Sequence, residues 1–138
     1  MTWSIRAGGS GDIDAVLAMW REGQALESVT DNPEGLSVLL TRDPGALVLA
    51  EAEGAVIGSI IAGWDGWRGQ LYRLAVLPAW RRRGVASALV RAGEDRLVTL
   101  GARRIGATVV DGHDHAAAFW RSVGYVAEGQ TRYVRTIG

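Results

Sequence analysis

The stretch Val76-Leu77-Pro78-Ala79-Trp80-Arg81-Arg82-Arg83-Gly84-Val85-Ala86 decides the fold of this chain. The apolar residues 71–77 predict a strand, and apolar residues at helical spacing after Gly84 predict a helix. The first amide N–H groups of a helix have no intrahelical partner, and the helix dipole adds partial positive charge at that end. Gly84 allows the backbone to approach a ligand closely. The strand, turn and helix together predict an anion site that suits a pyrophosphate.

The composition is that of a globular protein with one domain over residues 1–138. Hydrophobic residues make up 48% and charged residues 22% of the chain, and the formal net charge is zero. This balance gives no reason to expect a nucleic acid or a membrane as partner. The absence of cysteine excludes disulfides, thiolate metal sites and cysteine nucleophiles, and no metal ligand is assigned. The chain lacks both an apolar run long enough to span a membrane and a secretory leader, so a cytoplasmic enzyme or binding domain is expected.

Apolar periodicity and turn residues give the order of the elements. Asp31 and Asn32 are alternative caps for the second helix, and residues 63–69 form a loop rich in Gly and Trp. This order predicts a mixed α/β domain. The expected elements are a strand at 2–7, a helix from Ile13 to about Glu27, a helix at 34–41, strands at 46–51, 55–62 and 70–77, a helix at 84–100, a strand at 104–110, a helix at 114–122 and a strand at 131–136.

Two motifs carry a resemblance to a known family. Residues 81–86 resemble the Q/R-x-x-G-x-G/A signature of the GCN5-related N-acetyltransferases (GNAT), placed between the fourth strand and the third helix. Residues 116–125 resemble the A-x-x-F-Y-x-x-x-G-F segment of the same family. The loop at 63–69 looks like that of a bacterial subgroup with a G-x-D-G-x-R-G segment. The resemblance implies a mostly antiparallel sheet with splayed fourth and fifth strands and about four helices.

The resemblance also implies a reaction and its cosubstrate. A relative of these enzymes would transfer the acetyl group of acetyl-CoA to an amine by direct attack, the acceptor being a small molecule or a peptide N-terminus. The backbone of the fourth strand would bind the pantetheine arm and the thioester, and the turn would hold the pyrophosphate. The residues implied for the cosubstrate are Leu74, Ala75, Val76, Leu77, Arg81, Arg82, Arg83, Gly84, Val85, Ala86, His113, Phe119 and Trp120.

Two of these residues depart from the family pattern. His113 stands where an Asn is frequent, and Trp120 stands where a Tyr is proposed as general acid. An indole N–H is a donor but not a general acid. A thiolate leaving group has a pKa of about 8.5, only about 2 kcal/mol from neutral pH, so water, Tyr125 or Tyr72 are alternative proton sources. Either the enzyme works with a different acid, or the chain is a non-catalytic acyl-CoA-binding module or sensor.

The sequence leaves three alternative candidates for the general base: Tyr72, Glu27 and Asp65. A base matters most for a lysine-like amine, because its deprotonation near pH 7 costs about 4–5 kcal/mol, against about 1 kcal/mol for an α-amino group. Each candidate has a structural alternative: Tyr72 in the core, Glu27 on a helix surface, and Asp65 in an Asp-Gly turn. The loop residues Trp64 and Trp67 suit either an acceptor pocket or the surface of a possible homodimer.

Overall fold

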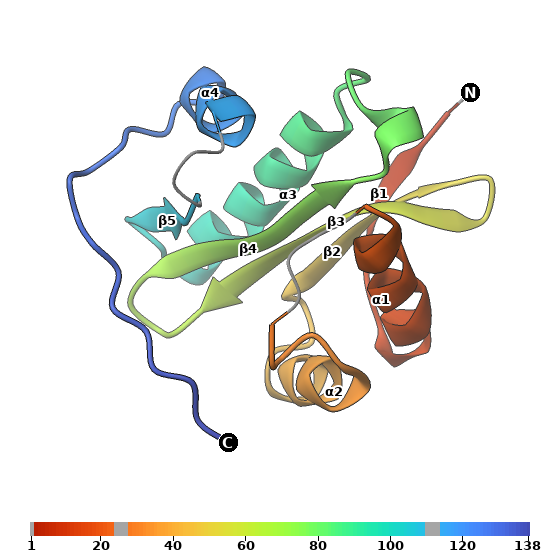
Figure 1. The fold of residues 1–138 in the computed structure, drawn as a ribbon, viewed down its shortest axis with the longest axis horizontal. Coiled ribbons are helices and arrows are strands. Elements are labelled where there is room, and N and C mark those ends of the chain that lie inside the picture. Colours follow the sequence, from red (N-terminus) through yellow and green to blue (C-terminus); the bar gives the residue numbers. More distant parts are fainter. Residues whose placement is uncertain (1, 24–27, 110–113) are drawn as a thin grey trace. The chain divides into compact units, whose positions relative to one another are not determined.

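The computed structural model describes residues 2–23, 28–109 and 114–138. These residues form two compact units, 1–107 and 108–138, apart from the residues not described. The first unit holds the sheet and three of the four α-helices described, and the second holds the fourth helix (Figure 1). The mixed α/β fold predicted from the sequence is confirmed.

The sheet contains five strands in the order β1-β2-β3-β4-β5. Neighbouring strands are antiparallel from β1 to β4, whereas β5 is parallel to β4. The pairing of β4 with β5 covers only Gly69–Leu71 of β4. The strands are β1 (Ser4–Ala7), β2 (Leu47–Ala52), β3 (Ala55–Trp64), β4 (Gly69–Val76) and β5 (Ile105–Ala107).

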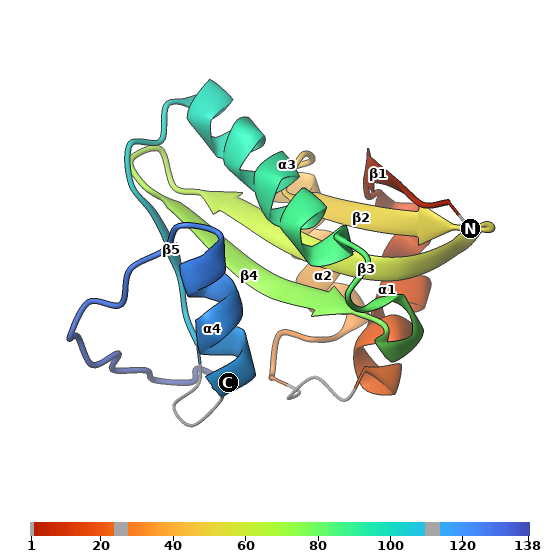
Figure 2. The same ribbon diagram turned by 90° about the horizontal axis from the view of Figure 1, so that it is seen from above.

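Helices cover both faces of this sheet, as Figure 2 shows. Helix α3 (Val85–Leu100) lies on one face, where Gly93 allows it to approach Leu71 of β4 closely. Helices α1 (Ile13–Glu22) and α2 (Pro33–Arg42) lie on the other face and pack with Leu47, Leu49 and Ile61. Because β3 is covered on both faces, its residues 57–62 are continuously buried, as is typical of a central strand.

The start of α2 is fixed by side-chain and backbone contacts. Of the two alternative caps, Asn32 has this role: its Oδ1 accepts the amide of Gly35 at 2.8 Å. A Cβ on Gly35 would lie 2.2 Å from the carbonyl oxygen of Thr30, so only glycine fits there. Asp31 does not cap the helix, and its carboxylate is bound elsewhere.

Some of the expected elements differ in the structure. The strand predicted at 104–110 is shorter: β5 covers only Ile105–Ala107, and residues 108 and 109 are not in a strand. The strand predicted at 131–136 is wrong, because residues 123–138 form neither helix nor strand and Tyr133 and Val134 are largely exposed. Strand propensity reflects packing against a neighbour, and in the described residues this segment pairs with no strand. Helix α1 ends at Glu22 and is followed by a turn at Gly23, so it is shorter than predicted over the described residues.

No helix within the described ranges is both long and apolar enough to cross a membrane.

Candidate functional site

The turn between β4 and α3 has the geometry of an anion-binding loop. After the 3-10 helix η2 (Pro78–Trp80), Arg82 and Gly84 both adopt left-handed backbone conformations, with φ of 62° and 82°. The first helical hydrogen bond of α3 runs from the amide of Ala88 to the carbonyl of Gly84 at 3.1 Å. The amides of residues 85–87 precede that bond and therefore have no intrahelical acceptor. Such an array of free amides at a helix start binds phosphate.

Packing holds this turn in place. Trp80 is buried, and the guanidinium of Arg83 lies 5.0 Å from its ring centroid. Arg81 donates from Nε to the carbonyl of Val76 at 3.1 Å. Arg81, Arg82 and Arg83 are all solvent-exposed, so their charges face the solution at the start of the helix. The sequence reasoning placed Gly84 here for close approach of a ligand, and the structure adds a second reason, its positive φ.

Beyond Leu71, β4 has an open edge. The register with β5 stops at Leu71, and within the described residues no strand pairs with this edge of residues 72–76. The partly buried residues Leu74, Ala75 and Val76 belong to this open edge, and Leu77 follows it and leads into the turn. The sequence-predicted backbone site and the predicted phosphate turn are therefore continuous along β4.

A β-bulge interrupts β4 in the middle of this edge. Ser59 pairs with Ala75, but Ile61 pairs with Tyr72, so one extra residue lies on β4 opposite Ile60. Arg73 at the bulge has a φ of 52°, a left-handed conformation that is uncommon for arginine. The Arg73 carbonyl accepts a hydrogen bond from the buried hydroxyl of Ser59 at 2.9 Å.

The same hydroxyl connects the bulge to α1. The indole Nε1 of Trp20 donates to Ser59 Oγ at 2.8 Å. The guanidinium of Arg73 lies 5.4 Å from the Trp20 ring and forms an ion pair with Asp31. Sequence reasoning missed this network. A lone serine within an apolar strand and a tryptophan N–H that needs an acceptor were the available signals.

The three candidate bases are placed differently. Tyr72 is 45% exposed, and its ring lies against Gly63 of β3, where a Cβ would be 3.3 Å from Cε2. The adjacent Leu71 faces α3, so Tyr72 faces away from that helix. Glu27 lies outside the described residues.

Asp65 shapes a turn. Its Oδ1 accepts the amides of Trp67 and Arg68, each at 2.7 Å, and these two hydrogen bonds lower its pKa, the bond from Arg68 contributing most. A carboxylate with a lowered pKa is a weaker base, so these contacts favour the turn alternative for Asp65.

The two loop tryptophans make different contacts. Trp64 approaches the end of α3, where a Cβ on Gly101 would be 3.9 Å from its ring. Trp67 is 71% exposed and stacks with the guanidinium of Arg68 at 4.1 Å. These contacts give no support to a pocket lined jointly by both rings.

The second unit brings the aromatic residues of the downstream motif together. In α4 (Asp114–Ser122), Phe119 and Trp120 make an edge contact with centroids 5.6 Å apart. The Tyr125 ring contacts Trp120 with centroids 4.9 Å apart, and the Tyr125 amide donates to the Trp120 carbonyl at 2.9 Å. His113 lies outside the described residues.

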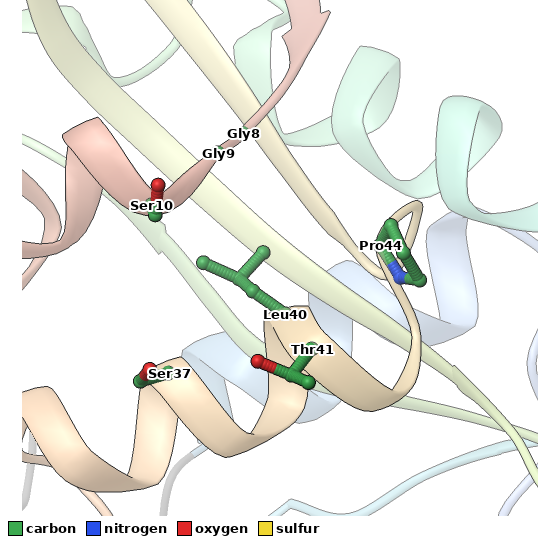
Figure 3. Close-up of a pocket in the computed structure, with 7 residues that line it drawn as sticks. All are labelled: Gly8, Gly9, Ser10, Ser37, Leu40, Thr41 and Pro44. Carbon is green, nitrogen blue, oxygen red and sulfur yellow. The ribbon is translucent and has the colours of Figure 1, made fainter.

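A shallow pocket of about 310 Å³ lies elsewhere, between the turn after β1 and α2 (Figure 3). None of the sequence-predicted site residues lines it. Its lining residues are Gly8, Gly9, Ser10, Ser37, Leu40, Thr41 and Pro44.

The fold and the turn together indicate the class of protein. The chain has a mixed sheet whose fourth strand has an open edge, and this strand leads into a helix whose first amides are arranged as in phosphate-binding turns. The model of the acetyltransferase (GNAT) family matches residues 15–125. A curated acetyltransferase from Pectobacterium atrosepticum is 32% identical over 114 residues, which cover 83% of this chain and 81% of that protein. The chain therefore belongs to the GNAT family, as the sequence motifs predicted.

Solved structures share this fold. Ard1 from Thermoplasma volcanium superimposes with a TM-score of 0.83 at 21% identity, covering 94% of this chain and 86% of that one. The enzyme AAC(6')-Iy, in complex with the bisubstrate analogue CoA-S-monomethyl-acetylneamine, superimposes with a TM-score of 0.78 at 18% identity, covering all of both chains.

Proposed function

We propose that this protein is an acetyl-CoA-dependent N-acetyltransferase that acts by direct attack of an amine on the thioester. The observation that carries the proposal is the open edge of β4 leading into the turn at residues 81–86. Membership of the family and the relatives named acetyltransferases support it. A structural neighbour in complex with a CoA-containing bisubstrate analogue supports CoA as the carrier.

In this proposal the cosubstrate follows β4. Of the amides predicted at residues 81–86, that of Arg81 donates to the Pro78 carbonyl, so the amides of residues 82–86 hold the pyrophosphate. Each charge-assisted hydrogen bond contributes about 1.5–3 kcal/mol. Leu74, Ala75, Val76 and Leu77 bind the pantetheine arm through their backbone. The exposed guanidinium groups of Arg81, Arg82 and Arg83 add long-range attraction for the phosphates. His113, Phe119 and Trp120 stay predicted contacts of the cosubstrate.

The reaction itself needs little from the protein beyond orientation and proton transfer. The amine nitrogen attacks the carbonyl carbon, the carbon–sulfur bond breaks, and the amine proton ends on the base while the CoA thiolate receives a proton. Amide groups beside the thioester would stabilise the oxyanion. Among the described candidate bases, Tyr72 and Asp65 are both exposed, and the turn contacts of Asp65 leave Tyr72 as the favoured base. Glu27 stays a second candidate, and Tyr125 is the candidate acid.

The acceptor is a small-molecule amine or a peptide N-terminus. The analogue bound to the structural neighbour AAC(6')-Iy contains acetylneamine, an aminoglycoside fragment. Small polyamines are therefore among the acceptors to test. An α-amino acceptor needs less help from a base than a lysine-like amine does. Cytoplasmic location and a possible homodimer stay predictions of the same kind.

Release of CoA thiol from acetyl-CoA tests the proposal, with a panel of peptides bearing free N-termini, spermidine and neamine as acceptors. We expect amine-dependent release for at least one acceptor. Tyr72→Phe keeps the ring on Gly63 and should lower kcat by about 10²-fold if Tyr72 moves the proton, whereas Asp65→Asn should leave kcat within about twofold. CoA binding without turnover on any acceptor would contradict the proposal.

That last result would favour the second candidate function, a non-catalytic acyl-CoA-binding module or sensor. The observation behind it is the indole of Trp120, which contacts the Tyr125 ring and cannot act as a general acid.

A further inference from the structure

Arg73 is held in an unfavourable backbone conformation by contacts from three other elements. A positive φ of 52° is disfavoured for a long side chain, so the surrounding structure must determine it. Ser59 on β3 binds its carbonyl, the Trp20 ring on α1 lies over its guanidinium, and Asp31 binds that guanidinium. The bulge is thus the point at which β4 contacts the segment between α1 and α2.

The contact with Asp31 is a two-point ion pair. Arg73 Nε donates to Asp31 Oδ1 at 3.2 Å, and its NH2 group donates to Oδ2. The two side chains are mostly buried, with exposed fractions of 24% for Arg73 and 11% for Asp31. Paired nitrogen donors on one carboxylate fix direction as well as distance, which makes such a pair suited to positioning.

Asp31 also organises the segment 28–32. Its Oδ2 accepts the amide of Ser28 at 2.8 Å, and its own amide donates to the Ser28 carbonyl at 3.0 Å. The next residue, Asn32, caps α2. One carboxylate therefore ties a compact turn to the bulge of β4.

The bulge lies where the reacting end of the cosubstrate would be. Arg73 is three residues before Val76 at the end of β4, a distance of about 10 Å along a strand. A pantetheine arm that runs from the turn along the open edge passes Val76 first and reaches Arg73 with its thioester end. The segment 28–32 would then flank the thioester.

We propose that Asp31 and Arg73 are a positioning pair that fixes the segment 28–32 beside the thioester and so sets where the acceptor amine approaches. This inference rests on the proposed acetyltransferase function. Neither residue touches the reacting atoms: the pair acts through the backbone of the segment and of the bulge.

A second ion pair in the chain supplies a matched control. Arg96 on α3 binds Asp43 and also donates to the carbonyl of Ala62 at 2.6 Å. The exposed fractions of these side chains, 18% and 24%, are similar to those of the first pair. Arg96 and Asp43 contact neither the bulge nor the segment 28–32 in the contacts described.

The experiment compares Asp31→Asn with Asp43→Asn. Asparagine can still accept the Ser28 amide, so Asp31→Asn removes the charge but keeps the turn. Using the amine that the wild-type protein acetylates fastest, we expect Asp31→Asn to raise the KM for the amine at least about fivefold. The affinity for CoA should stay within about twofold. Asp43→Asn should lower the melting temperature similarly and leave the KM unchanged.

A double-mutant cycle tests whether the two residues act through each other. The double variant Asp31→Asn/Arg73→Gln should raise the amine KM by little more than Asp31→Asn alone, because the first substitution already breaks the pair. An unchanged KM in Asp31→Asn, or an equal rise in Asp43→Asn, would overturn the proposal.

Hydrogen exchange tests the positioning without turnover. Asp31→Asn should accelerate amide exchange in both segments 28–32 and 72–76, whereas Asp43→Asn should change neither. Acceleration in the first segment alone would show that the pair does not hold the bulge and would overturn the proposal. This measurement needs no acceptor, so it separates a failure of the pair from a failure of the proposed function, which would appear as wild-type protein that acetylates no amine of the panel.

Discussion

Replacing Gly84 by alanine separates the backbone requirement of the proposed phosphate turn at residues 81–86 from any general loss of stability. Gly84 has a φ of 82°, and a Cβ there would meet no atom of the protein within 4 Å. The substitution therefore costs only left-handed strain, about 1 kcal/mol. For a chain of this size that cost corresponds to a fall of about 3–4 °C in melting temperature.

Gly54 is the matched control. It lies in the hairpin turn between β2 and β3, has a φ of 77°, and likewise has open space at its Cβ position. Gly54→Ala should therefore lower the melting temperature by about the same amount. It should leave CoA binding unchanged, because the hairpin lies outside the proposed phosphate site.

The effect on CoA affinity follows from the amides that the turn presents. If relaxation of the strained turn removes one charge-assisted hydrogen bond to the pyrophosphate, the loss is about 1.5–3 kcal/mol, or roughly 10- to 150-fold in Kd. Titration calorimetry with CoA measures this directly for both variants. Equal Kd values for Gly84→Ala and Gly54→Ala would refute the assignment of the turn.

Three further predictions concern the structure around the site. Ser59→Ala should lower the free energy of unfolding by about 2 kcal/mol in urea titrations, because it removes the hydroxyl that binds the Trp20 N–H and the Arg73 carbonyl. Ser37→Ala, on the exposed face of α2, should change it by less than about 0.5 kcal/mol. Gly35→Ala should be destabilising by more than about 2 kcal/mol in the same assay, since a Cβ would collide with a backbone oxygen that cannot move aside. Asp12→Asn should lower stability by about 1 kcal/mol at neutral pH and by clearly less at pH 2, which is near the pKa of Asp12 in the folded protein.

The pH dependence of the last variant has a definite sign. The hydrogen bond from Arg6, followed by that from the Gly9 amide, lowers the pKa of Asp12 from 3.8 to about 2. A depressed pKa in the folded state stabilises the protein above pH 4, and this contribution is lost as the pH falls from 4 towards 2. Solvent screens the pair because the Arg6 and Asp12 side chains are 36% and 20% exposed. A difference in melting temperature that is as large at pH 2 as at pH 7 would contradict this assignment.

Local patterns in the sequence were enough to predict most of the first unit. The apolar run of β4, the turn at 81–86 and the periodicity of α3 are local features, and each favours the same structure that packing produces. The strand predicted at 131–136 failed because residue types there favour a strand only when a neighbouring strand is available.

The contacts around the bulge could not be predicted, because they join residues far apart in the chain. Arg73 contacts Asp31 across 42 positions, and Trp20 contacts Ser59 across 39. The left-handed conformation of Arg73 has no local signature, since arginine rarely adopts it. Asp31 looked like a helix cap, the role that its neighbour Asn32 has in the structure.

Mass spectrometry of all the products of one reaction tests the proposed transfer most directly. The protein is incubated with acetyl-CoA carrying a labelled acetyl group and with the best acceptor of the panel. Direct attack predicts that labelled acetyl-amine and free CoA form in equal amounts, while the protein itself carries no label. The chain has no cysteine and no lysine, so its α-amino group is its only ordinary acyl-accepting amine. Label retained on the protein during turnover, or CoA bound with no acetylated amine formed, would contradict the proposed function.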